Sequence, residues 1–547
     1  MPHDAVFIGS GINSLAGAAL LAQKGWNVCV LEREERLGGC IYTSDELTLP
    51  GYRHEVLASW HPLFTGSAAY AELKDELDRR GLEYVNTGLP TASAFPDGSA
   101  AFVTSSLDGN VAEFGRHATA DGAAWQRQFE EFMGNADLSF GLLSTELWST
   151  AGLGLGQKAY RRLGRRGLLE FTGRTLSSCR DWVESTFESE AAHGVLAPWV
   201  LHTGLGPEQA TSGFMTQVIA AALQLGGMPI PVGGGIRLVE ALCAIVRDAG
   251  GEVRSGVDVE RVLVSGGRAT GVRTADGELV EASRAVVANV MPAQLYGRLL
   301  SGQATAGVAR AAERYRHGRA EMQIHLALDA PPQWRGPEAE RLAQTAIVHV
   351  TPGLDGVSRA VNEAERGLLP AEATIVVGQP CALDPSRAPA GGSIIWIQLQ
   401  ELPAGRVKGD AAGELDVGDG SWTDELREAY ADRIVARLAG SIVNLDEASL
   451  KRAVLSPVDL ESLNCNLVGG DIYGGSCALD QNLLWRPFAE APGHATEVDG
   501  LWQIGAGTHP GPGLGAGSGY LVASELTRPA LPRRVLSRLP LDRLRRA

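Results

Sequence analysis

Glycine-rich turns near both ends of the chain have the composition of a dinucleotide-binding site. Near the start, an apolar run ends at Ile8 and leads into Gly9-Ser10-Gly11-Ile12-Asn13-Ser14. Gly9 would permit a tight turn after a strand, and Gly11 would let the backbone approach a pyrophosphate. A helix over residues 12–24 would direct the positive end of its dipole at the phosphates. We therefore expect a nucleotide to bind Gly9, Gly11, Ile12, Asn13 and Ser14, with Ser14 in place of the usual third glycine.

A carboxylate follows at the spacing that such a site requires. The next apolar run, Val28 to Leu31, ends at Glu32, about 20 residues after the glycines, where an acid binds the ribose hydroxyls. The alternative is a solvated acid at a strand end. The segment that follows resembles the one with which FAD enzymes of the glutathione-reductase type wrap their cofactor. On that resemblance the FAD contacts would include Arg33, Arg36, Gly38 and Gly39, and a polar surface loop is the alternative.

The second glycine-rich turn, residues 505–511, follows the apolar run 501–504 near the other end of the chain. We expect this run to be a strand of the same sheet, and Gly505, Ala506, Gly513 and Leu514 to contact the cofactor. A final helix over 518–526 would direct its N-terminal dipole at the flavin and stabilise the reduced anion.

Two histidines close to these turns could take part in catalysis. His509 lies within the second turn, and His61 lies between Trp60 and Pro62. Either imidazole could act as a base or orient a carbonyl group. The alternative is that each histidine only forms hydrogen bonds with nearby backbone.

The elements that must position these residues are distributed along the whole chain. Residues 229–289 predict a helix (236–249), strands at 252–254 and 257–264, short strands around Asp276-Gly277, and a buried strand at 285–289. FAD domains of this type carry such an insertion. In them a residue at the place of Val259 contacts the adenine through its backbone, and Asn289 would end a strand near the cofactor.

The fold class expected is therefore α/β, with a discontinuous FAD-binding Rossmann domain of the glutathione-reductase type and an α+β substrate domain. Residues 1–62, 228–295 and 495–527 would form the FAD-binding domain, and residues 63–227 and 296–494 the substrate domain. The first substrate segment reads as largely helical, with helices at 68–80, 122–143 and 211–225. Residues 528–547 form a basic C-terminal tail.

Composition excludes several functional classes. A chain of 547 residues with 44% hydrophobic residues can build two domains with large cores. Its net charge of −16 argues against nucleic-acid binding. The seven cysteines show no metal-ligand spacing and suit free thiols in a reducing cytosol, so we expect no metal and a cytoplasmic location. No secretory signal is visible, and no apolar run reaches the roughly 20 residues that span a bilayer.

Two basic segments interleaved with apolar residues suit an anionic membrane surface, from which an apolar substrate could be collected. One is Lys158 to Arg166, and the other is a set of tail arginines: Arg533, Arg534, Arg538, Arg543, Arg545 and Arg546. Peripheral membrane contact is one interpretation. A solvated helix face, an acidic patch of the same chain and a subunit contact in a homo-oligomer are the alternatives.

Taken together, these landmarks resemble the phytoene desaturase family of FAD-dependent oxidoreductases, which includes carotenoid desaturases and isomerases and an uncharacterised branch of bacterial dehydrogenases. The resemblance rests on Pro231 to Gly235, Asn464 to Gly470, Asp480-Gln481, Arg486-Pro487 and Gly505 to Gly511. Ser14 and the segment His54-Glu55-Val56 depart from the family pattern. The resemblance implies dehydrogenation, or desaturation, of a small apolar or conjugated molecule by hydride transfer to flavin N5.

No second nicotinamide-binding unit is visible, because the glycines at 266–271 fall inside a strand meander. The expected electron acceptor is therefore oxygen, a quinone or another carrier. Two other functions stay open at this point. A flavin amine oxidase shares the fold and usually holds a lysine near N5, but none of the five lysines lies in a cofactor motif. A redox-neutral isomerase, or a flavoprotein without turnover, is the other.

Overall fold

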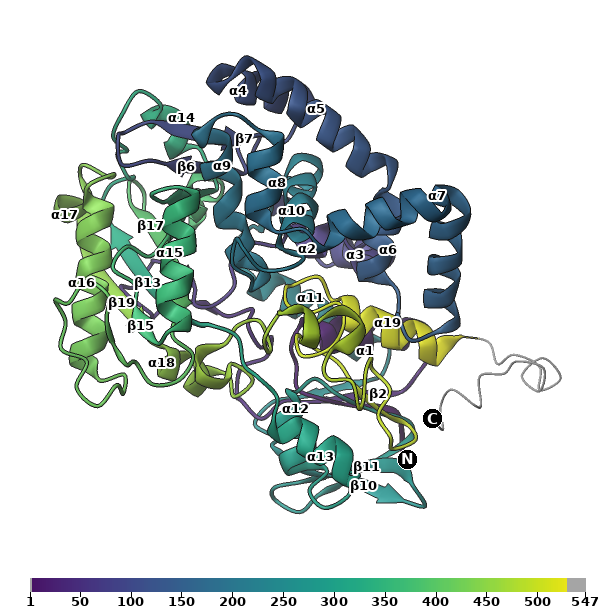
Figure 1. Ribbon diagram of the computed structural model, residues 1–547. Coiled ribbons are helices and arrows are strands. Elements are labelled where there is room, and N and C mark those ends of the chain that lie inside the picture. Colours follow the sequence, from purple (N-terminus) through teal and green to yellow (C-terminus); the bar gives the residue numbers. More distant parts are fainter. Residues whose placement is uncertain (1, 529–547) are drawn as a thin grey trace.

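The first β-sheet is assembled from distant parts of the chain. A computed structural model describes residues 2–528 (Figure 1). Its parallel strands follow the order β9 (Glu252–Arg254), β2 (Val28–Leu31), β1 (His3–Ile8), β12 (Leu279–Ala288) and β20 (Leu501–Gln503). Strands β10 (Val259–Ser265) and β11 (Arg268–Thr274) continue from β12 as an antiparallel meander. Because the chain enters these parallel strands in the same direction, the loops after β1, β2, β12 and β20 meet at one edge.

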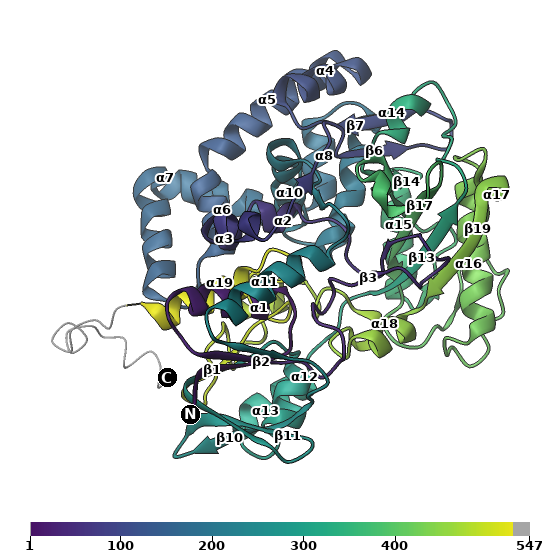
Figure 2. The ribbon, with the colours of Figure 1, turned by 180° about the vertical axis from the view of Figure 1, so that it is seen from behind.

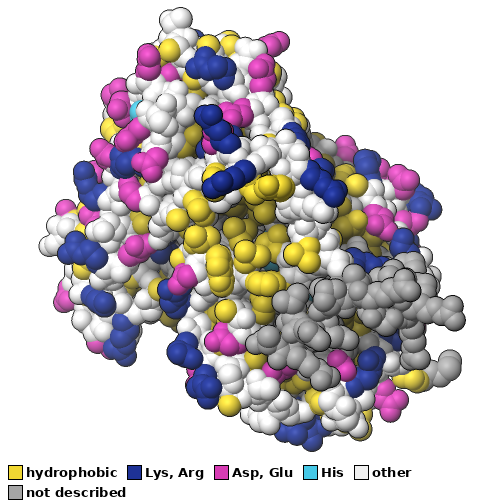
Figure 3. Space-filling view, turned by 45° about the vertical axis from the view of Figure 1, so that its right-hand side comes forward, with side chains coloured by type: hydrophobic (Ala, Val, Ile, Leu, Met, Phe, Trp, Pro, Cys, Tyr) yellow, Lys and Arg dark blue, Asp and Glu magenta, His cyan; other side chains and the backbone are white. Residues whose placement is uncertain are grey.

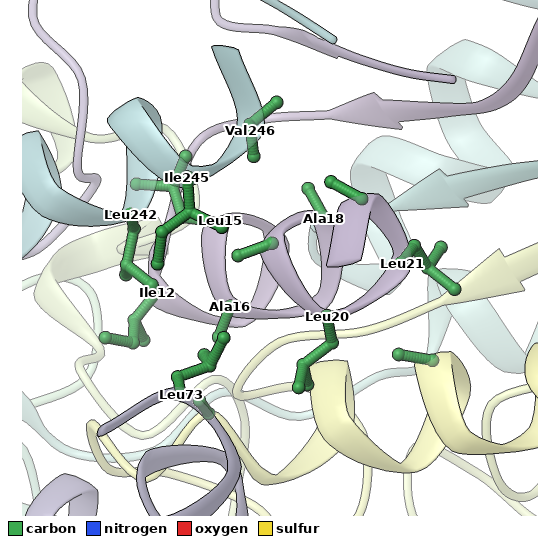
Figure 4. Packing of buried hydrophobic residues seen from close by; sticks show 14 of the residues in the cluster. Ile12, Leu15, Ala16, Ala18, Leu20, Leu21, Leu73, Leu242, Ile245 and Val246 are labelled. Carbon is green, nitrogen blue, oxygen red and sulfur yellow. The ribbon is translucent and has the colours of Figure 1, made fainter. Parts of the chain in front are cut away.

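Helices α1 (Ile12–Gln23), α11 (Ile236–Asp248) and α19 (Gly517–Thr527) cover one face of this sheet, and α3 (Ala68–Arg79) packs against these helices. Figure 4 shows Leu15 and Ile12 of α1 packed beside Leu242 and Ile245 of α11, and Leu73 of α3 on the other side of the helix. Helix α1 is buried almost all round, because it lies between the strands and these neighbours. The opposite face of the sheet is covered by the meander and by α13 (Ala306–Glu313).

The second sheet is antiparallel except at one pair. Its order is β19 (Ser449–Leu455), β13 (Ala320–Leu328), β17 (Ser393–Leu402), β16 (Ile375–Gly378), β14 (Ile347–Val350), β6 (Thr91–Ala94) and β7 (Ala100–Val103). Strands β14 and β6 are the parallel pair. Helix α16 (Asp424–Ala439) covers one face with Tyr430, Ile434 and Leu438. The other face looks toward the helices and the first sheet (Figure 2).

A helical segment stands over both sheets. It comprises α4 (Leu107–His117), α5 (Thr119–Gly134), α6 (Ala136–Ser144), α7 (Thr150–Leu176), α8 (Cys179–Thr186), α9 (Glu190–Leu196) and α10 (Ser212–Gly226). Helix α7 is kinked at Gly164, whose φ is 65°. None of the helices within residues 2–528 combines the length and the apolar character that crossing a bilayer requires.

The α/β architecture expected from the sequence is confirmed, with three local corrections. The short strand expected after Asp276-Gly277 and the buried strand expected at 285–289 belong to one strand, β12, whose pairing with β1 shifts register between Ala282 and Ala285. The predicted helix 122–143 is two helices separated at Asn135. The segment expected to be largely helical also contributes β6 and β7 to the second sheet. The tail arginines from Arg533 onward lie outside the described residues.

Candidate active site

A cavity of about 380 Å³ lies between two surfaces. One is the edge of the first sheet where β1, β2, β12 and β20 end, and the other is the face of the second sheet opposite α16. All but one of the residues predicted from sequence to bind the cofactor line it. They are Gly9, Gly11, Ile12, Asn13, Glu32, Arg33, Arg36, Gly38, Gly39, Val259, Asn289, Gly505, Ala506, Gly513 and Leu514. The exception is Ser14, which is fully buried within α1, so its small size serves packing.

The turn between β1 and α1 has no room for side chains. Gly9 has a φ of +89°, in the left-handed region that favours glycine. A Cβ on Gly11 would lie 2.9 Å from Nδ2 of Asn289, and a Cβ on Gly505 would lie 2.4 Å from Oδ1 of the same side chain. Asn289 therefore occupies the space between the two glycine turns, and each glycine is required for that approach.

A chain of hydrogen bonds fixes the Glu32 carboxylate. The Gly38 N–H donates to Ser10 Oγ (3.0 Å), and Ser10 Oγ donates to Glu32 Oε2 (2.7 Å). The Ser10 and Glu34 N–H groups also donate to this carboxylate, at 2.8 and 3.0 Å. Glu32 is 8% exposed and faces the cavity. This is an oriented anion with unused lone pairs, as ribose hydroxyl binding requires.

At this end of the cavity, Arg36 links the segment after β2 to the distant segment that contains Leu463. Its guanidinium donates to the Gly39 carbonyl (2.8 Å) and to the Leu463 carbonyl (2.6 Å), and it stacks over Tyr42 at 4.2 Å. Arg33 pairs with Glu34 at 2.7 Å. Arg298, which sequence reasoning missed, also lines the cavity, and it donates to the Val259 carbonyl at 2.8 Å.

Helices α1 and α19 begin side by side at the cavity. Ser518 Oγ donates to Asn13 Oδ1 (2.8 Å) and accepts from the Gly505 N–H (2.9 Å). The two helices cross so closely that a Cβ on Gly519 would lie 2.0 Å from the Asn13 carbonyl oxygen. Two positive helix ends thus converge near the glycine turns, which suits an anionic diphosphate.

The two histidines proposed for catalysis are not among the described residues that line the cavity. His61 Nδ1 lies 2.9 Å from the Tyr84 hydroxyl, and its neighbours Trp60 and Pro62 line the cavity instead. His509 is 1% exposed, and its carbonyl lies 2.8 Å from Nε2 of His494. Burial lowers the pKa of His61 to about 3 and that of His509 to about 4, so both are neutral at pH 7.

The far wall of the cavity is built by the second sheet together with residues 57–60, 199–202 and 223–228, and sequence reasoning missed its polar residues. Glu321 and Gln323 on β13, Gln398 and Gln400 on β17, and His202 are its polar members. Its apolar members include Leu57, Trp60, Trp199, Leu223, Met228, Ile347 and Trp396. The sequence does carry a signal for this wall, because polar and apolar residues alternate along β13 and β17. The apolar residues Met322, Ile324, Ile397 and Leu399 point to the other face, into the core.

The titratable side chains of this wall, Glu321 and His202, are mostly neutral at pH 7. Burial raises the pKa of the Glu321 carboxyl to about 8, although the Gln323 and Gln398 amides oppose that rise. Burial lowers the pKa of His202 to about 3. His202 Nε2 lies 3.1 Å from Nε2 of His349.

The arrangement can hold a dinucleotide cofactor along one edge and a largely apolar molecule against the opposite wall. The glycine turns exclude side chains, Glu32 supplies a ribose acceptor, and the helix ends suit phosphates. These residues and the aromatic and aliphatic residues of the far wall line one continuous cavity. These observations fit FAD.

Comparison with known proteins agrees with this geometry. A profile of the family described as "Flavin containing amine oxidoreductase" matches residues 15–459. One of the subunits of the limonene dehydrogenase of Castellaniella defragrans is 24% identical over 541 residues, covering 96% of this chain and 94% of that protein. The neurosporene-forming phytoene desaturase of Rhodobacter capsulatus is 23% identical, covering 95% and 93%. A redesigned putrescine oxidase shares the fold with a TM-score of 0.58 at 14% identity, covering 98% of this chain and 99% of that chain.

Proposed function

The chain belongs to the flavin containing amine oxidoreductase family, and we propose that it dehydrogenates an apolar or conjugated small molecule. It is an FAD-dependent oxidoreductase similar to dehydrogenases and carotenoid desaturases. The observation that carries the proposal is the shape of the cavity. A single chamber joins Glu32 and the glycine turns to a wall of Leu223, Met228 and Ile347.

The cofactor, when bound, supplies the acceptor for a hydride. The chain supplies binding and orientation. Glu32 binds the ribose, and the N-terminal ends of α1 and α19 offset phosphate charge. Apolar and aromatic residues around the remaining space exclude water and hold the substrate skeleton by burial of its surface.

The amine oxidase alternative is disfavoured by the position of the lysines. Lys24, Lys74, Lys158, Lys408 and Lys451 are all exposed, and none of them is among the described residues that line the cavity. The structure therefore offers no lysine for the place next to flavin N5. The electron acceptor that we propose is oxygen, a quinone or another carrier.

Anaerobic reduction tests the proposal. Candidate substrates are identified by mass spectrometry of small molecules that co-purify with the protein, and each is added to the yellow holoenzyme without oxygen. A dehydrogenase loses the visible absorbance of its flavin and regains it only when an acceptor is added. A redox-neutral isomerase would convert the substrate while the flavin stays oxidised, and that result would refute dehydrogenation.

We also propose that α7 contacts an anionic membrane surface. Leu153 and Leu169 are each 65% exposed and Tyr160 is 56% exposed. Figure 3, which brings the α7 side of the molecule forward, shows hydrophobic side chains gathered around a hollow with basic side chains at its rim. Of the basic residues, Lys158 and Arg162 pair with Asp137 at 2.6 and 2.7 Å, and Arg166 pairs with Glu170 at 2.9 Å. Arg161 and Arg165 are therefore the better candidates for lipid contact.

Co-sedimentation with anionic liposomes at low salt tests this contact. Changing Arg161 and Arg165 to Gln should weaken binding, because each cation near an anionic surface contributes about 1 kcal/mol. Changing the exposed Arg310 and Arg314 to Gln removes the same charge elsewhere and is the control. Wild-type protein that stays wholly in the supernatant would show that α7 is only a solvated face.

A further inference from the structure

The second sheet presents a buried polar face to the cavity. Along β13 and β17, alternate residues point to opposite faces of the sheet. On one face Met322, Ile324, Ile397 and Leu399 pack into the core under α16. On the other face, four polar side chains line the cavity, and each is at most 8% exposed: Glu321, Gln323, Gln398 and Gln400.

These polar groups bind one another only in part. Gln323 Nε2 donates to Glu321 Oε1 (2.6 Å), and Gln398 Nε2 donates to Glu321 Oε2 (2.8 Å). Within residues 2–528, Oε1 of Gln323 and Oε1 of Gln400 have no hydrogen-bond partner, although both side chains are almost fully buried. A buried polar atom without a partner is costly, and such atoms are usually paired by protein, water or ligand.

The wall carries no compensating cation. Among the described residues, no lysine, arginine or histidine forms an ion pair with Glu321. The other titratable groups close to it are Cys40, Tyr473 and His202. Burial raises the pKa of the Cys40 thiol and of the Tyr473 phenol and lowers the pKa of His202 to about 3, so all three stay neutral at pH 8. Since the pKa of Glu321 itself is raised to about 8, the wall is uncharged near neutral pH. It can donate and accept hydrogen bonds, but it cannot offset the charge of an ammonium group.

We propose that this wall binds an uncharged oxygen, carbonyl or hydroxyl, on an otherwise apolar substrate, with Glu321 as the residue that determines this specificity. The inference rests on the proposed function, and it narrows the substrate class from hydrocarbons in general to oxygenated ones. The neutral Glu321 carboxyl donates a hydrogen bond to a carbonyl oxygen. The free amide oxygens of Gln323 and Gln400 accept from a hydroxyl.

Calorimetric titration of the holoenzyme with three probes of one carbon skeleton tests the proposal. The probes are limonene, its ketone carvone and its amine perillylamine. At pH 7 carvone should bind at least about tenfold more tightly than limonene, which corresponds to one good buried hydrogen bond. It should also bind more tightly than the amine. Carvone has no ionising group, so its affinity should fall as the pH rises through 8 and Glu321 loses its proton.

Two variants locate the effect. Glu321→Gln should abolish the pH dependence of carvone binding while keeping the shape of the side chain. Glu401→Gln is the matched control, since Glu401 on β17 is likewise a fully buried acid but binds Thr374 on the core side of the sheet. It should leave both the preference and its pH dependence unchanged.

Limonene binding as tightly as carvone, tighter binding of the amine, or no binding of any probe overturns the proposal. So does a Glu321→Gln variant that titrates like wild type. The titration reads binding without turnover, so the two proposals fail separately. A clear preference for the ketone, in a protein whose flavin no substrate bleaches, would keep the oxygen site and refute the dehydrogenase.

Discussion

At the scale of single residues, Glu32 is held in place by the protein before any cofactor binds. Its carboxylate accepts three hydrogen bonds, from the Ser10 N–H and hydroxyl and from the Glu34 N–H. In Glu32→Gln an amide NH₂ would replace one acceptor oxygen opposite these donors. We expect the variant to lose about 1.5–3 kcal/mol of FAD binding, or roughly 10- to 150-fold in Kd.

Release of FAD on dilution, followed by flavin fluorescence, measures this effect. Ser14→Gly is the control, because Ser14 is not among the described cavity-lining residues and glycine is the commoner residue at that place. Equal Kd values for wild type and Glu32→Gln would refute the ribose assignment.

Glu321 has a second, independent consequence, for stability. Its pKa is raised to about 8 in the folded protein, so between about pH 4.5 and 8 the folded state binds more protons than the unfolded state. The free energy of unfolding therefore falls as the pH rises through this window. Glu321→Gln removes the titrating group, so the melting temperature of the variant minus that of wild type should increase from pH 5 to pH 8.

Differential scanning calorimetry of both holoproteins checks this trend. Glu425→Gln serves as the control, because Glu425 lies in the first turn of α16 and its pKa is lowered by a backbone hydrogen bond. Its effect should stay constant between pH 5 and 8. A Glu321→Gln difference that is equally constant would show that the carboxyl is not held neutral.

At the scale of elements, the crossing of α1 and α19 determines where the two glycine turns meet. Gly519→Ala would place a Cβ about 2.0 Å from the Asn13 backbone carbonyl, which cannot move without separating the helices. Overpacking of this kind costs about 1–3 kcal/mol. The variant should therefore melt at a lower temperature and retain less FAD, because the Asn13–Ser518 hydrogen bond lies at the same crossing.

Gly154→Ala is the matched substitution in an open helical position. A Cβ on Gly154 of α7 meets no atom within 4 Å among the described residues. Alanine there should be neutral or stabilise by about 0.5–1 kcal/mol, since glycine is a poor helix former. Thermal unfolding of both variants, with flavin occupancy read from absorbance, makes the comparison. Equal behaviour would mean that the two helices can separate freely.

At the scale of the whole molecule, both sheets contribute to the walls of one cavity. Segments far apart in the chain meet there, since Arg36 contacts Leu463, 427 residues further along. A ligand that binds only this assembled state stabilises it by mass action. At a free concentration of 100 times Kd, FAD should add about 2.7 kcal/mol to the free energy of unfolding.

FMN separates the two ends of the cavity. It carries the flavin ring but lacks the adenylate half of FAD, including the ribose that Glu32 would bind. We therefore expect FMN to raise the melting temperature of the apoprotein less than FAD does at the same concentration. A shift with FMN equal to that with FAD would contradict the placement of the nucleotide between Glu32 and the glycine turns.

The sequence by itself identified residues that gather at the glycine-turn end of the cavity. Gly9, Gly11, Glu32 and Gly38 lie in or just after one β-α-β unit. This local unit brings residues at that spacing along the chain close together in the fold. The C-terminal turn could be recognised for the same reason, because Gly505 directly follows β20. Local periodicity likewise predicted α3, α10 and α11 within a few residues.

Only the tertiary structure decided which other side chains face the cavity. His61 and His509 have neighbours at the cavity, yet packing turns both imidazoles into the protein. Glu321 and Gln398 are separated by 77 residues and meet because β13 and β17 pair. Their alternation marks two faces of a sheet, but a single sequence does not reveal which face is covered by α16 and which meets the cavity. That choice depends on contacts between elements distant in the chain, and these form only in the complete fold.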